Sequence, residues 1–282
     1  MEECIDIRVG RLDLAPRKWS IQKALYDGCT AAVDDRIGRL REYLENKGLL
    51  DDTIFIVTSD HGDVQDEHPP HVEHHLCAYD ELIRVPLIMR YPKALPKGRI
   101  VKWITQTLDI FPTILDILNV KDEEYRRTIQ GYSILPAIDD EPRRGFAFTE
   151  YMKPLQQFFL MWSRHPDFDI RSYNYMLKAL RTLKYKYIWY SNGADELYDL
   201  ENDPAEKHNL SDDVPNVTEE MREKMERFLL SIERVDYGDW LEIGRRIMRT
   251  PNSEELFKRL KVWGFYREIK TVPPLREQDK YL

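Results

Sequence analysis

Long apolar runs are missing from this sequence of 282 residues, since no stretch approaches the ~18 consecutive apolar residues that a membrane-spanning helix requires. The N-terminal segment also has neither the apolar core nor the small-residue cleavage site that is typical of an export signal. We therefore expect no membrane association, and the cytoplasm is the default expected compartment.

Cysteines and basic clusters are also scarce. Cys4, Cys29 and Cys77 are too few and too scattered to form a disulfide framework, so they do not indicate a compartment. The net charge is -8, and no basic cluster is long enough to follow a phosphate backbone. These absences exclude a general nucleic-acid surface and leave small or neutral molecules as the expected partners.

The first half of the chain alternates helix and strand patterns. Residues 26–47 carry apolar side chains three or four positions apart, which predicts a helix with one buried stripe. The β-branched and aliphatic run TIFIVTS at 53–59 predicts a strand buried on both faces. A second strand is expected at 85–89 and a helix at about 107–118. This order indicates an α/β unit.

The pattern changes after about residue 140. Aromatic-rich segments such as FAFTEY and KYKYIWYS, separated by turn residues, predict a separate antiparallel sheet. From residue 216 onward, charged helical runs such as EEMREKMERFLLSIERV and SEELFKRLKVW predict a helical tail. We therefore expect an α/β domain at 1–140, an antiparallel sheet subdomain at 141–212 and a helical extension at 213–282.

An acid and an imidazole stand side by side where the TIFIVTS strand ends. In open α/β sheets the carboxyl ends of the strands face the ligand crevice, so Asp60 and His61 could supply two adjacent metal ligands there. Gly62 would let the backbone turn away. The alternative is that Asp60 caps the next helix and His61 is simply exposed.

The histidines are concentrated just after this strand. Five of the seven lie within fifteen residues, beside three aspartates: His61, His68, His71, His74 and His75, with Asp60, Asp63 and Asp66. Such clusters bind metal ions or carry proton transfers. The alternatives are a solvated histidine-rich loop and an incidental zinc site made by His68, His71 and His74.

Several segments together resemble one enzyme family. The order of a helix, TIFIVTSDHGD, then HHLCAYDELIRVPLIMRYP is similar to that of type I sulfatases, which belong to the alkaline phosphatase superfamily. Further family-like segments are LDIFPTI at 108–114, GYSILP at 131–136 and ELYDLENDPAEKHNL at 196–210. The resemblance covers roughly residues 26–210. It implies part of an alkaline-phosphatase-like, mostly parallel sheet with flanking helices, followed by a small antiparallel sheet subdomain and a helical tail.

The resemblance also implies roles for individual residues. Asp60 and His61 would be ligands of a divalent cation, with calcium favoured and magnesium, manganese or zinc also compatible. His75 precedes Tyr79 by four positions, where many relatives have a sulfate-binding lysine, so it would contact the sulfate and act as a catalytic proton donor. His68 would be a further catalytic residue that lines the pocket. For Arg84 we expect a structural ion pair with Asp80 or Glu81.

The nucleophile motif of the family, Cys-x-Pro-x-Arg or its serine form, has no match. Cys4 and Arg8 have the right spacing, but Asp6 stands where proline or alanine is needed. The chain therefore resembles the C-terminal half of a sulfatase, and an upstream complementary half is an expected partner. The complete enzyme would hydrolyse a small-molecule or saccharide sulfate ester, whereas this chain alone is expected to be inactive.

Two other functions remain compatible with the sequence. One is a phosphatase, phosphodiesterase or phosphonate hydrolase of the same superfamily, because a cation site of this kind suits any tetrahedral oxyanion. The other is a non-catalytic scaffold or partner subunit that keeps the fold. The sequence does not identify the alcohol of the substrate, the metal ion or the oligomeric state.

Overall fold

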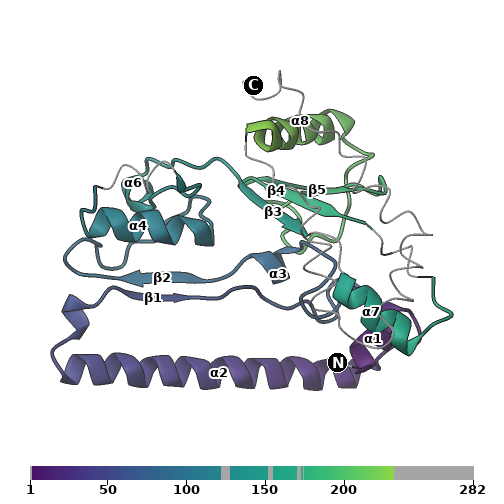
Figure 1. The fold of residues 1–282 in the computed structure, drawn as a ribbon, viewed down its shortest axis with the longest axis horizontal. Coiled ribbons are helices and arrows are strands. Elements are labelled where there is room, and N and C mark those ends of the chain that lie inside the picture. Colours follow the sequence, from purple (N-terminus) through teal and green to yellow (C-terminus); the bar gives the residue numbers. More distant parts are fainter. Residues whose placement is uncertain (1, 122–127, 152–154, 170–172, 174, 232–282) are drawn as a thin grey trace.

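The computed structural model describes residues 2–121, 128–151, 155–169, 173 and 175–231. Figure 1 shows two parts side by side. One part contains a long helix below a pair of strands, with short helices above them. The other is an antiparallel sheet that carries a helix on one face. The predicted histidine-rich segment lies where the two parts meet.

The long helix is α2, which runs from Pro16 to Asn46. Pro16 suits the first helical position because its fixed φ is already helical and its missing N–H would have no partner there. Gly48 follows the helix at a φ of 67°, a left-handed conformation that favours glycine. The predicted helix is thus confirmed, although it begins earlier than the apolar stripe indicated.

The first pair of strands is antiparallel, which corrects the expectation of a mostly parallel sheet. β1 (Phe55–Thr58) pairs with β2 (Leu87–Arg90), with Phe55 opposite Arg90. All strand pairs within the described residues are antiparallel. The reason is the connection between β1 and β2, whose only helix is the four-residue α3 (Asp80–Ile83). A parallel crossover usually contains a longer helix that packs on the sheet.

Two of the family-like segments, LDIFPTI and GYSILP, are joined by hydrogen bonds. The first contains η2 (Thr107–Asp109) and α4 (Ile110–Ile117), and the second leads into α6 (Leu135–Ile138). Asp109 Oδ1 accepts a bond from the backbone N–H of Tyr132 at 2.8 Å. A side chain at Gly131 would meet the carbonyl oxygen of Leu108, which explains the glycine.

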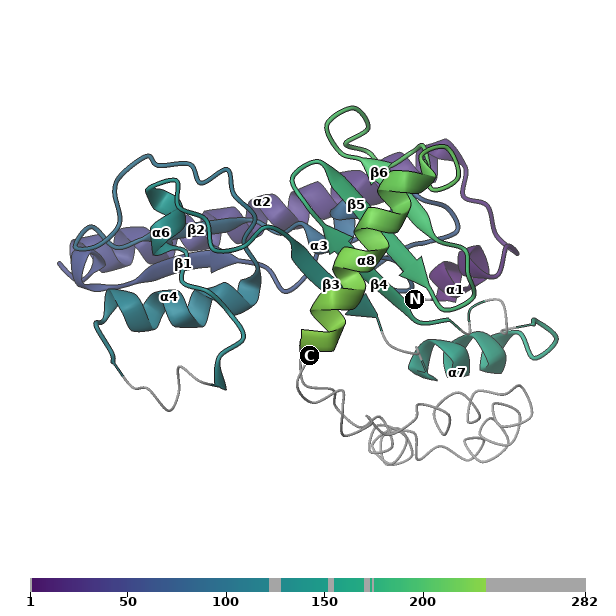
Figure 2. The ribbon, with the colours of Figure 1, turned by 90° about the horizontal axis from the view of Figure 1, so that it is seen from above.

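The predicted antiparallel sheet is confirmed. Its strands follow in chain order: β3 (Ala147–Tyr151), β4 (Leu177–Arg181), β5 (Tyr185–Tyr190) and β6 (Glu196–Asp199). Helix α8 (Pro215–Ser231) crosses one face of this sheet (Figure 2). The buried residues between them are Leu180, Tyr187, Leu197, Met221 and Met225. Burial of this apolar face stabilises both elements.

The other face of the sheet supports the histidine-rich segment. Buried side chains from that segment and α3 pack against strands β4 to β6, and they include Val64, Cys77, Ala78, Tyr79 and Leu82. Helices α1 (Glu2–Arg8) and α7 (Leu155–Arg164) lie next to each other beside this region (Figure 1). The antiparallel sheet therefore supports the histidine-rich segment from behind, while the end of β1 leads directly into Asp60 and His61.

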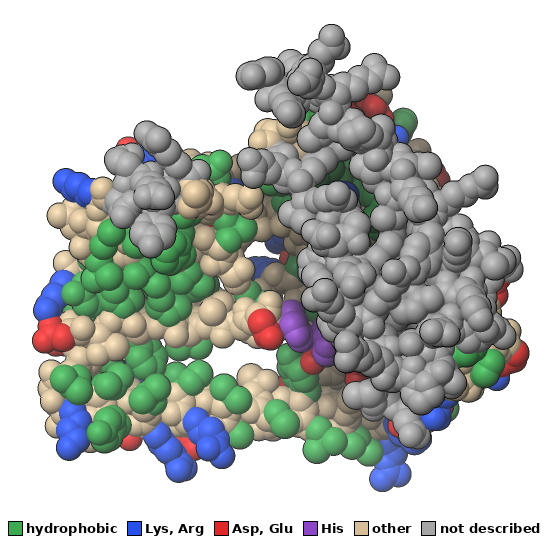
Figure 3. All heavy atoms as spheres, viewed as in Figure 1, with side chains coloured by type: hydrophobic (Ala, Val, Ile, Leu, Met, Phe, Trp, Pro, Cys, Tyr) green, Lys and Arg blue, Asp and Glu red, His purple; other side chains and the backbone are tan. Residues whose placement is uncertain are grey.

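The surface of α2 differs from the expectation of a buried stripe. Val33, Leu40 and Tyr43 are 56%, 52% and 57% exposed, and Trp19 is the buried residue of this helix. The residues of β1 are half-buried to exposed, so the prediction of a strand buried on both faces was wrong. Figure 3 shows open space between α2 and the β1–β2 pair, with apolar side chains along α2.

Among the described residues, no helix combines the length and the hydropathy needed to cross a bilayer. The predicted helix at SEELFKRLKVW lies outside the described residues, whereas α8 confirms the first helix of the expected tail. The two boundaries between the three expected domains remain predictions.

Candidate functional site

A tight turn at the end of β1 presents Asp60. Its Oδ1 accepts hydrogen bonds from the backbone N–H of His61 at 3.0 Å and from Ser59 Oγ at 3.3 Å. The His61 contacts hold the pKa of Asp60 below its usual range, so the carboxylate is ionised near neutral pH. The side chain is 86% exposed. The turn thus presents a charged oxygen ligand to the surroundings.

His61 is held in one orientation by its own turn. Its Nδ1 lies 2.8 Å from the carbonyl oxygen of Gly62, which is the geometry of an N–H donor. A neutral ring with the proton on Nδ1 has its lone pair on Nε2, and that atom lies 3.8 Å from Asp60 Oδ2. Two donor atoms at this separation fit a single divalent cation between them.

Gly62 is required by the close approach of α3. Its backbone N–H donates to the carbonyl oxygen of Leu82 at 2.8 Å. A Cβ atom at this position would lie 2.1 Å from the carbonyl oxygen of Glu81, which is a steric clash. The glycine of the Asp60-His61-Gly62 motif therefore lets the turn pack directly on the backbone of α3.

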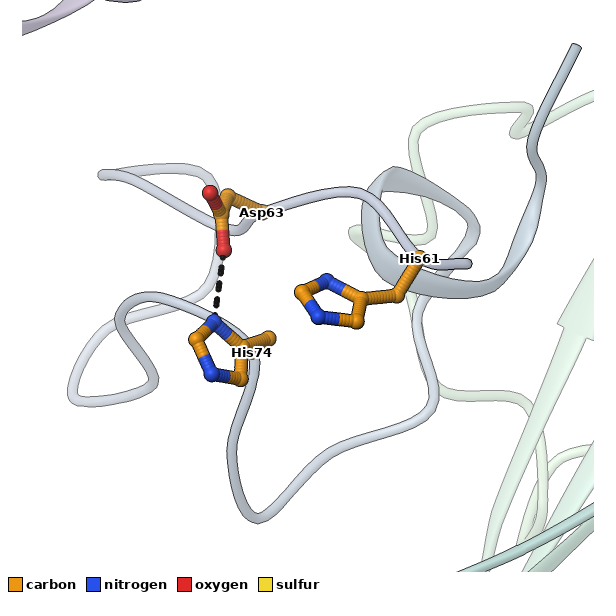
Figure 4. Close-up of side chains that lie close together, drawn as sticks. All are labelled: His61, Asp63 and His74. Carbon is orange, nitrogen blue, oxygen red and sulfur yellow. Dashed lines mark hydrogen bonds and ion pairs between the residues drawn. The ribbon is translucent and has the colours of Figure 1, made fainter. Parts of the chain in front are cut away.

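A second carboxylate–imidazole pair lies beside His61. Val64 and Glu73 exchange two backbone hydrogen bonds, which brings Asp63 next to His74. Asp63 Oδ1 lies 3.0 Å from His74 Nδ1, and the rings of His61 and His74 are 4.4 Å apart. Figure 4 shows the three side chains together. Ligand atoms of all three lie within 4.8 Å of one another, so they could also hold a metal ion.

His75 adjoins this cluster through His74, since the two ring centroids are 4.2 Å apart. Burial, Arg8 and His74 together lower the pKa of His75 to about 4. The ring is therefore neutral near pH 7, and it would bind an anion as an N–H donor rather than as a permanent charge. This differs from a lysine at the same position.

Arg8 of α1 is buried behind the segment that carries His74 and His75. It is 3% exposed and donates to the carbonyl oxygen of Val72 at 2.8 Å and to Glu73 Oε2 at 2.9 Å. Its guanidinium thus holds the turn before His74 in place. Nothing in the sequence indicated this role, because the contact joins residues more than sixty positions apart.

His68 lies elsewhere. Its ring stacks on Tyr79 at 3.7 Å with an interplanar angle of 9°, and its Nε2 lies 3.4 Å from Glu81 Oε2. It is 9% exposed. The structure thus groups His61, His74 and His75 with Asp60 and Asp63, whereas His68 belongs to a different set of contacts. Its proposed catalytic role has no contact with that cluster to support it.

Asp80, which was expected to pair with Arg84, forms ion pairs with other residues. Asp80 pairs instead with Arg181 at 3.0 Å and with the buried Lys186 at 2.7 Å. Arg84 is exposed. The reason is that β4 and β5 pass directly behind α3 and present two cations to Asp80.

Cys4 is half-buried against the core that contains Ile7, Trp19 and Val72. Burial, followed by the charge of Glu73, raises the pKa of its thiol, which keeps it protonated near neutral pH. This environment favours a packing role for Cys4 over a nucleophilic one.

Comparison with known proteins identifies the family. The sulfatase family model matches residues 17–120, and the model for the C-terminal part of N-sulphoglucosamine sulphohydrolase matches residues 74–233. The second match covers more than half of the chain. The chain belongs to the sulfatase family.

Two curated relatives show the extent of the similarity. The N-acetylglucosamine-6-O-sulfatase of Bacteroides thetaiotaomicron is 34% identical over 68% of this chain and 33% of its own length. Human arylsulfatase K is 31% identical over 72% of this chain and 36% of its own length. This chain therefore spans about a third of the curated relatives that it matches.

Solved structures confirm the expected α/β fold class. A protein in complex with its substrate D-glucosamine-2-N,6-O-disulfate is 31% identical, with a TM-score of 0.57 over 71% of this chain and 38% of that chain. The phosphonate monoester hydrolase of Agrobacterium radiobacter is 28% identical, with a TM-score of 0.58 over 76% of this chain and 42% of that chain. Sulfatases generally bind a divalent cation, and the described residues include groups that could hold one.

Proposed function

We propose that this chain supplies part of the catalytic site of an enzyme that hydrolyses a sulfate ester of a saccharide. Asp60 and His61 are the cation ligands of this site, and His75 is its anion-binding residue. The observation that carries the proposal is the arrangement at the end of β1, where the Asp60 carboxylate and the free Nε2 of His61 face each other next to the His74–His75 pair.

The residues of the chain have distinct tasks in this proposal. Asp60 and His61 hold the cation, calcium by the family resemblance, which supplies positive charge to a sulfate oxygen when bound. Asp63 accepts the Nδ1 proton of His74 and so orients that ring beside His61. His75 donates an N–H to the sulfate or to the leaving oxygen. Arg8 keeps the backbone under His74 and His75 in position.

Further ligands and the nucleophile come from an upstream complementary half. Two observations support this partner. The chain covers only about a third of its curated relatives, and the apolar face of α2 is open to a gap in the molecule. Histidine and acidic side chains lie together at the inner end of this gap in Figure 3. A partner that fills the gap would therefore reach the cation ligands.

The saccharide sulfate is the favoured substrate because of the relatives. One curated relative is an N-acetylglucosamine-6-O-sulfatase, and one solved relative holds D-glucosamine-2-N,6-O-disulfate as its substrate. A second candidate function is phosphonate monoester hydrolysis. The similarity to two phosphonate monoester hydrolases, at TM-scores of 0.58 and 0.60, favours it.

The test starts from the DNA upstream of Met1. We expect it to encode an Asp-Asp strand and a Cys-x-Pro-x-Arg segment, and the chain should be expressed together with that segment. The joined protein should hydrolyse glucosamine 6-sulfate and an aryl sulfate in the presence of calcium, whereas the chain alone should not. His75→Ala should lower kcat/KM by about 10²–10³-fold, as expected for loss of a hydrogen-bond donor to the reacting oxyanion.

Each alternative predicts a different outcome of this experiment. Faster hydrolysis of a phosphonate monoester than of any sulfate ester would favour the second function. Cation binding without hydrolysis of either ester would indicate a non-catalytic scaffold. An upstream sequence with no nucleophile motif would contradict the complementary half.

A further inference from the structure

Three buried polar atoms on different segments point at the same place without hydrogen-bond partners. They are His68 Nε2, Glu81 Oε2 and Glu206 Oε1, and all lie within 4.8 Å of one another. His68 and Glu206 are 9% and 2% exposed. Buried polar atoms almost always have a partner, because an unpaired one costs free energy. Three buried atoms without a hydrogen bond around one point therefore favour a ligand there.

The neighbouring cation, Lys186, forms an ion pair with only one of these three atoms, Glu206 Oε1. Lys186 donates to the carbonyl oxygen of Ala78 at 3.0 Å and to Asp80 Oδ1 at 2.7 Å. It also lies 2.6 Å from Glu206 Oε1, without the geometry of a hydrogen bond. That oxygen has two lone pairs, so the ion pair leaves it able to bind a second cation.

The carboxylates of this network outnumber its Lys and Arg side chains. Asp80, Glu81 and Glu206 contribute three carboxylates, whereas Arg181 and Lys186 contribute two cations. Glu206 is almost fully enclosed, at 2% exposed. A positive ion bound beside Glu81 and Glu206 would supply the third positive charge.

The geometry favours a metal ion over a simple hydrogen bond. His68 Nε2 and Glu81 Oε2 are 3.4 Å apart, beyond the usual 2.7–3.2 Å of an N–H···O bond. Two ligands of a tetrahedral zinc ion, each at ~2.0–2.2 Å, lie about 3.3–3.5 Å apart. Stacking on Tyr79 fixes the plane of the His68 ring, so its lone pair has one direction.

We propose that His68, Glu81 and Glu206 form a second metal site, which takes a zinc-like transition metal ion. One imidazole and two carboxylates are suitable ligands for such an ion, and a water molecule would complete the tetrahedron. The ion ties together the loop at 64–75, helix α3 and the loop at 203–210. It therefore fastens the histidine-rich loop to the antiparallel sheet.

The experiment uses the whole chain after dialysis against a chelator. His61→Ala first removes a ligand that the Asp60–His61 pair and the His61–Asp63–His74 group share, so that neither set competes. In this background we expect one cobalt ion to bind with the visible absorption of tetrahedral coordination, and zinc to displace it. Adding Glu81→Gln should weaken zinc binding at least about tenfold, because it removes one of three ligands. Glu201→Gln, an exposed change, should leave binding unaltered.

Glu81 is suited to this test because its side chain is 26% exposed, so the glutamine variant should keep the fold. Equal affinity for zinc with and without Glu81→Gln would overturn the proposal. Nuclear magnetic resonance of the His68 ring gives a second test that needs no variant. Zinc should shift the signals of the His68 ring, and Nε2 should carry no proton when zinc is bound. A ring protonated on both nitrogens at pH 7, unchanged by zinc, would show that a proton completes the network.

Discussion

The antiparallel sheet and the α2–β1–β2 part of the molecule differ in how much of their apolar surface is buried. Both faces of the β3–β6 sheet are covered, one by α8 and the other by the histidine-rich segment and α3. By contrast, α2 leaves a row of apolar side chains exposed, and β1 and β2 contribute no residue to the buried core clusters of the described chain. Buried apolar area is the main source of stability.

The difference shows which part of the chain buries its own apolar surface. The sheet and α8 enclose a core of their own, whereas the α2–β1–β2 part leaves apolar side chains of α2 uncovered. An apolar face this extended is uncommon on a monomeric protein and marks a contact surface. The candidate site lies between the two parts, so the sheet fixes its histidines while the open side is available to a partner.

The largest expected effect on stability comes from replacing the buried Lys186 of β5. Lys186→Met should lower the free energy of unfolding by about 3–5 kcal/mol, because it leaves the buried carboxylate of Glu206 without its cation and leaves Asp80 with Arg181 alone. Lys184→Met is the matched control, since Lys184 is half-exposed and pairs with Glu201 only at 3.9 Å. Urea denaturation measures both. A loss below about 1 kcal/mol for Lys186→Met would show that the buried pairs contribute little.

A matched pair of leucines tests the comparison itself. Leu180 of β4 is fully buried, and Leu180→Ala should cost about 2–5 kcal/mol. Leu40 of α2 is 52% exposed, and Leu40→Ala should change stability by no more than about 0.5 kcal/mol in the chain alone. Equal losses in urea denaturation would mean that α2 is covered in solution.

Acid sensitivity should come from Asp80. Burial alone would raise the pKa of Asp80, but Lys186 and Arg181 outweigh it and hold the pKa below its usual value. A lowered pKa means that its contribution to stability is present above the ordinary aspartate pKa of ~3.9 and is lost as the pH falls through the folded-state value.

Asp80→Asn removes this contribution. The wild-type chain should therefore be more stable than the variant at neutral pH, and the gap should narrow as the pH falls from about 6 to about 3. Thermal unfolding at several pH values measures it. A gap that does not change with pH would contradict the assigned shift.

The smallest expected effect on the stability of the chain alone comes from a substitution on the exposed apolar face of α2. Val33→Ser should leave its stability within about 0.5 kcal/mol, because Val33 is 56% exposed. In the joined protein with its upstream half, the same change should lower the melting temperature. Thr30→Ser, on the same helix, is the control. If Val33→Ser has the same effect on the stability of the chain alone and of the joined protein, this face is not part of the interface.

Much of the fold followed from local sequence patterns. The antiparallel sheet could be predicted because aromatic and β-branched residues alternate with turn signals. Helix α2 could be predicted from its apolar spacing. The direction of β2 could not, because the strand pattern is the same for either pairing and the connection from β1 to β2 is long enough for both.

The candidate site was partly predictable. The turn at Asp60 and His61 follows from the end of a strand, whereas His75 was singled out by the family resemblance, through its place four residues before Tyr79. The pairing of Asp63 with His74 depends on the Val64–Glu73 bridge, and the support from Arg8 depends on a distant helix. Such long-range contacts leave no periodic signal in a single sequence.

The most direct test of the central claim is to locate a cation on the chain itself. Manganese is a suitable probe, because it accepts oxygen and imidazole ligands and broadens nearby resonances. The ring signals of His61 and His74 should broaden at lower manganese concentration than those of His165 and His208. Asp60→Asn should weaken the effect at least about tenfold, whereas Asp51→Asn, at an exposed aspartate, should not. Equal broadening in the Asp60→Asn variant would contradict Asp60 and His61 as the cation ligands.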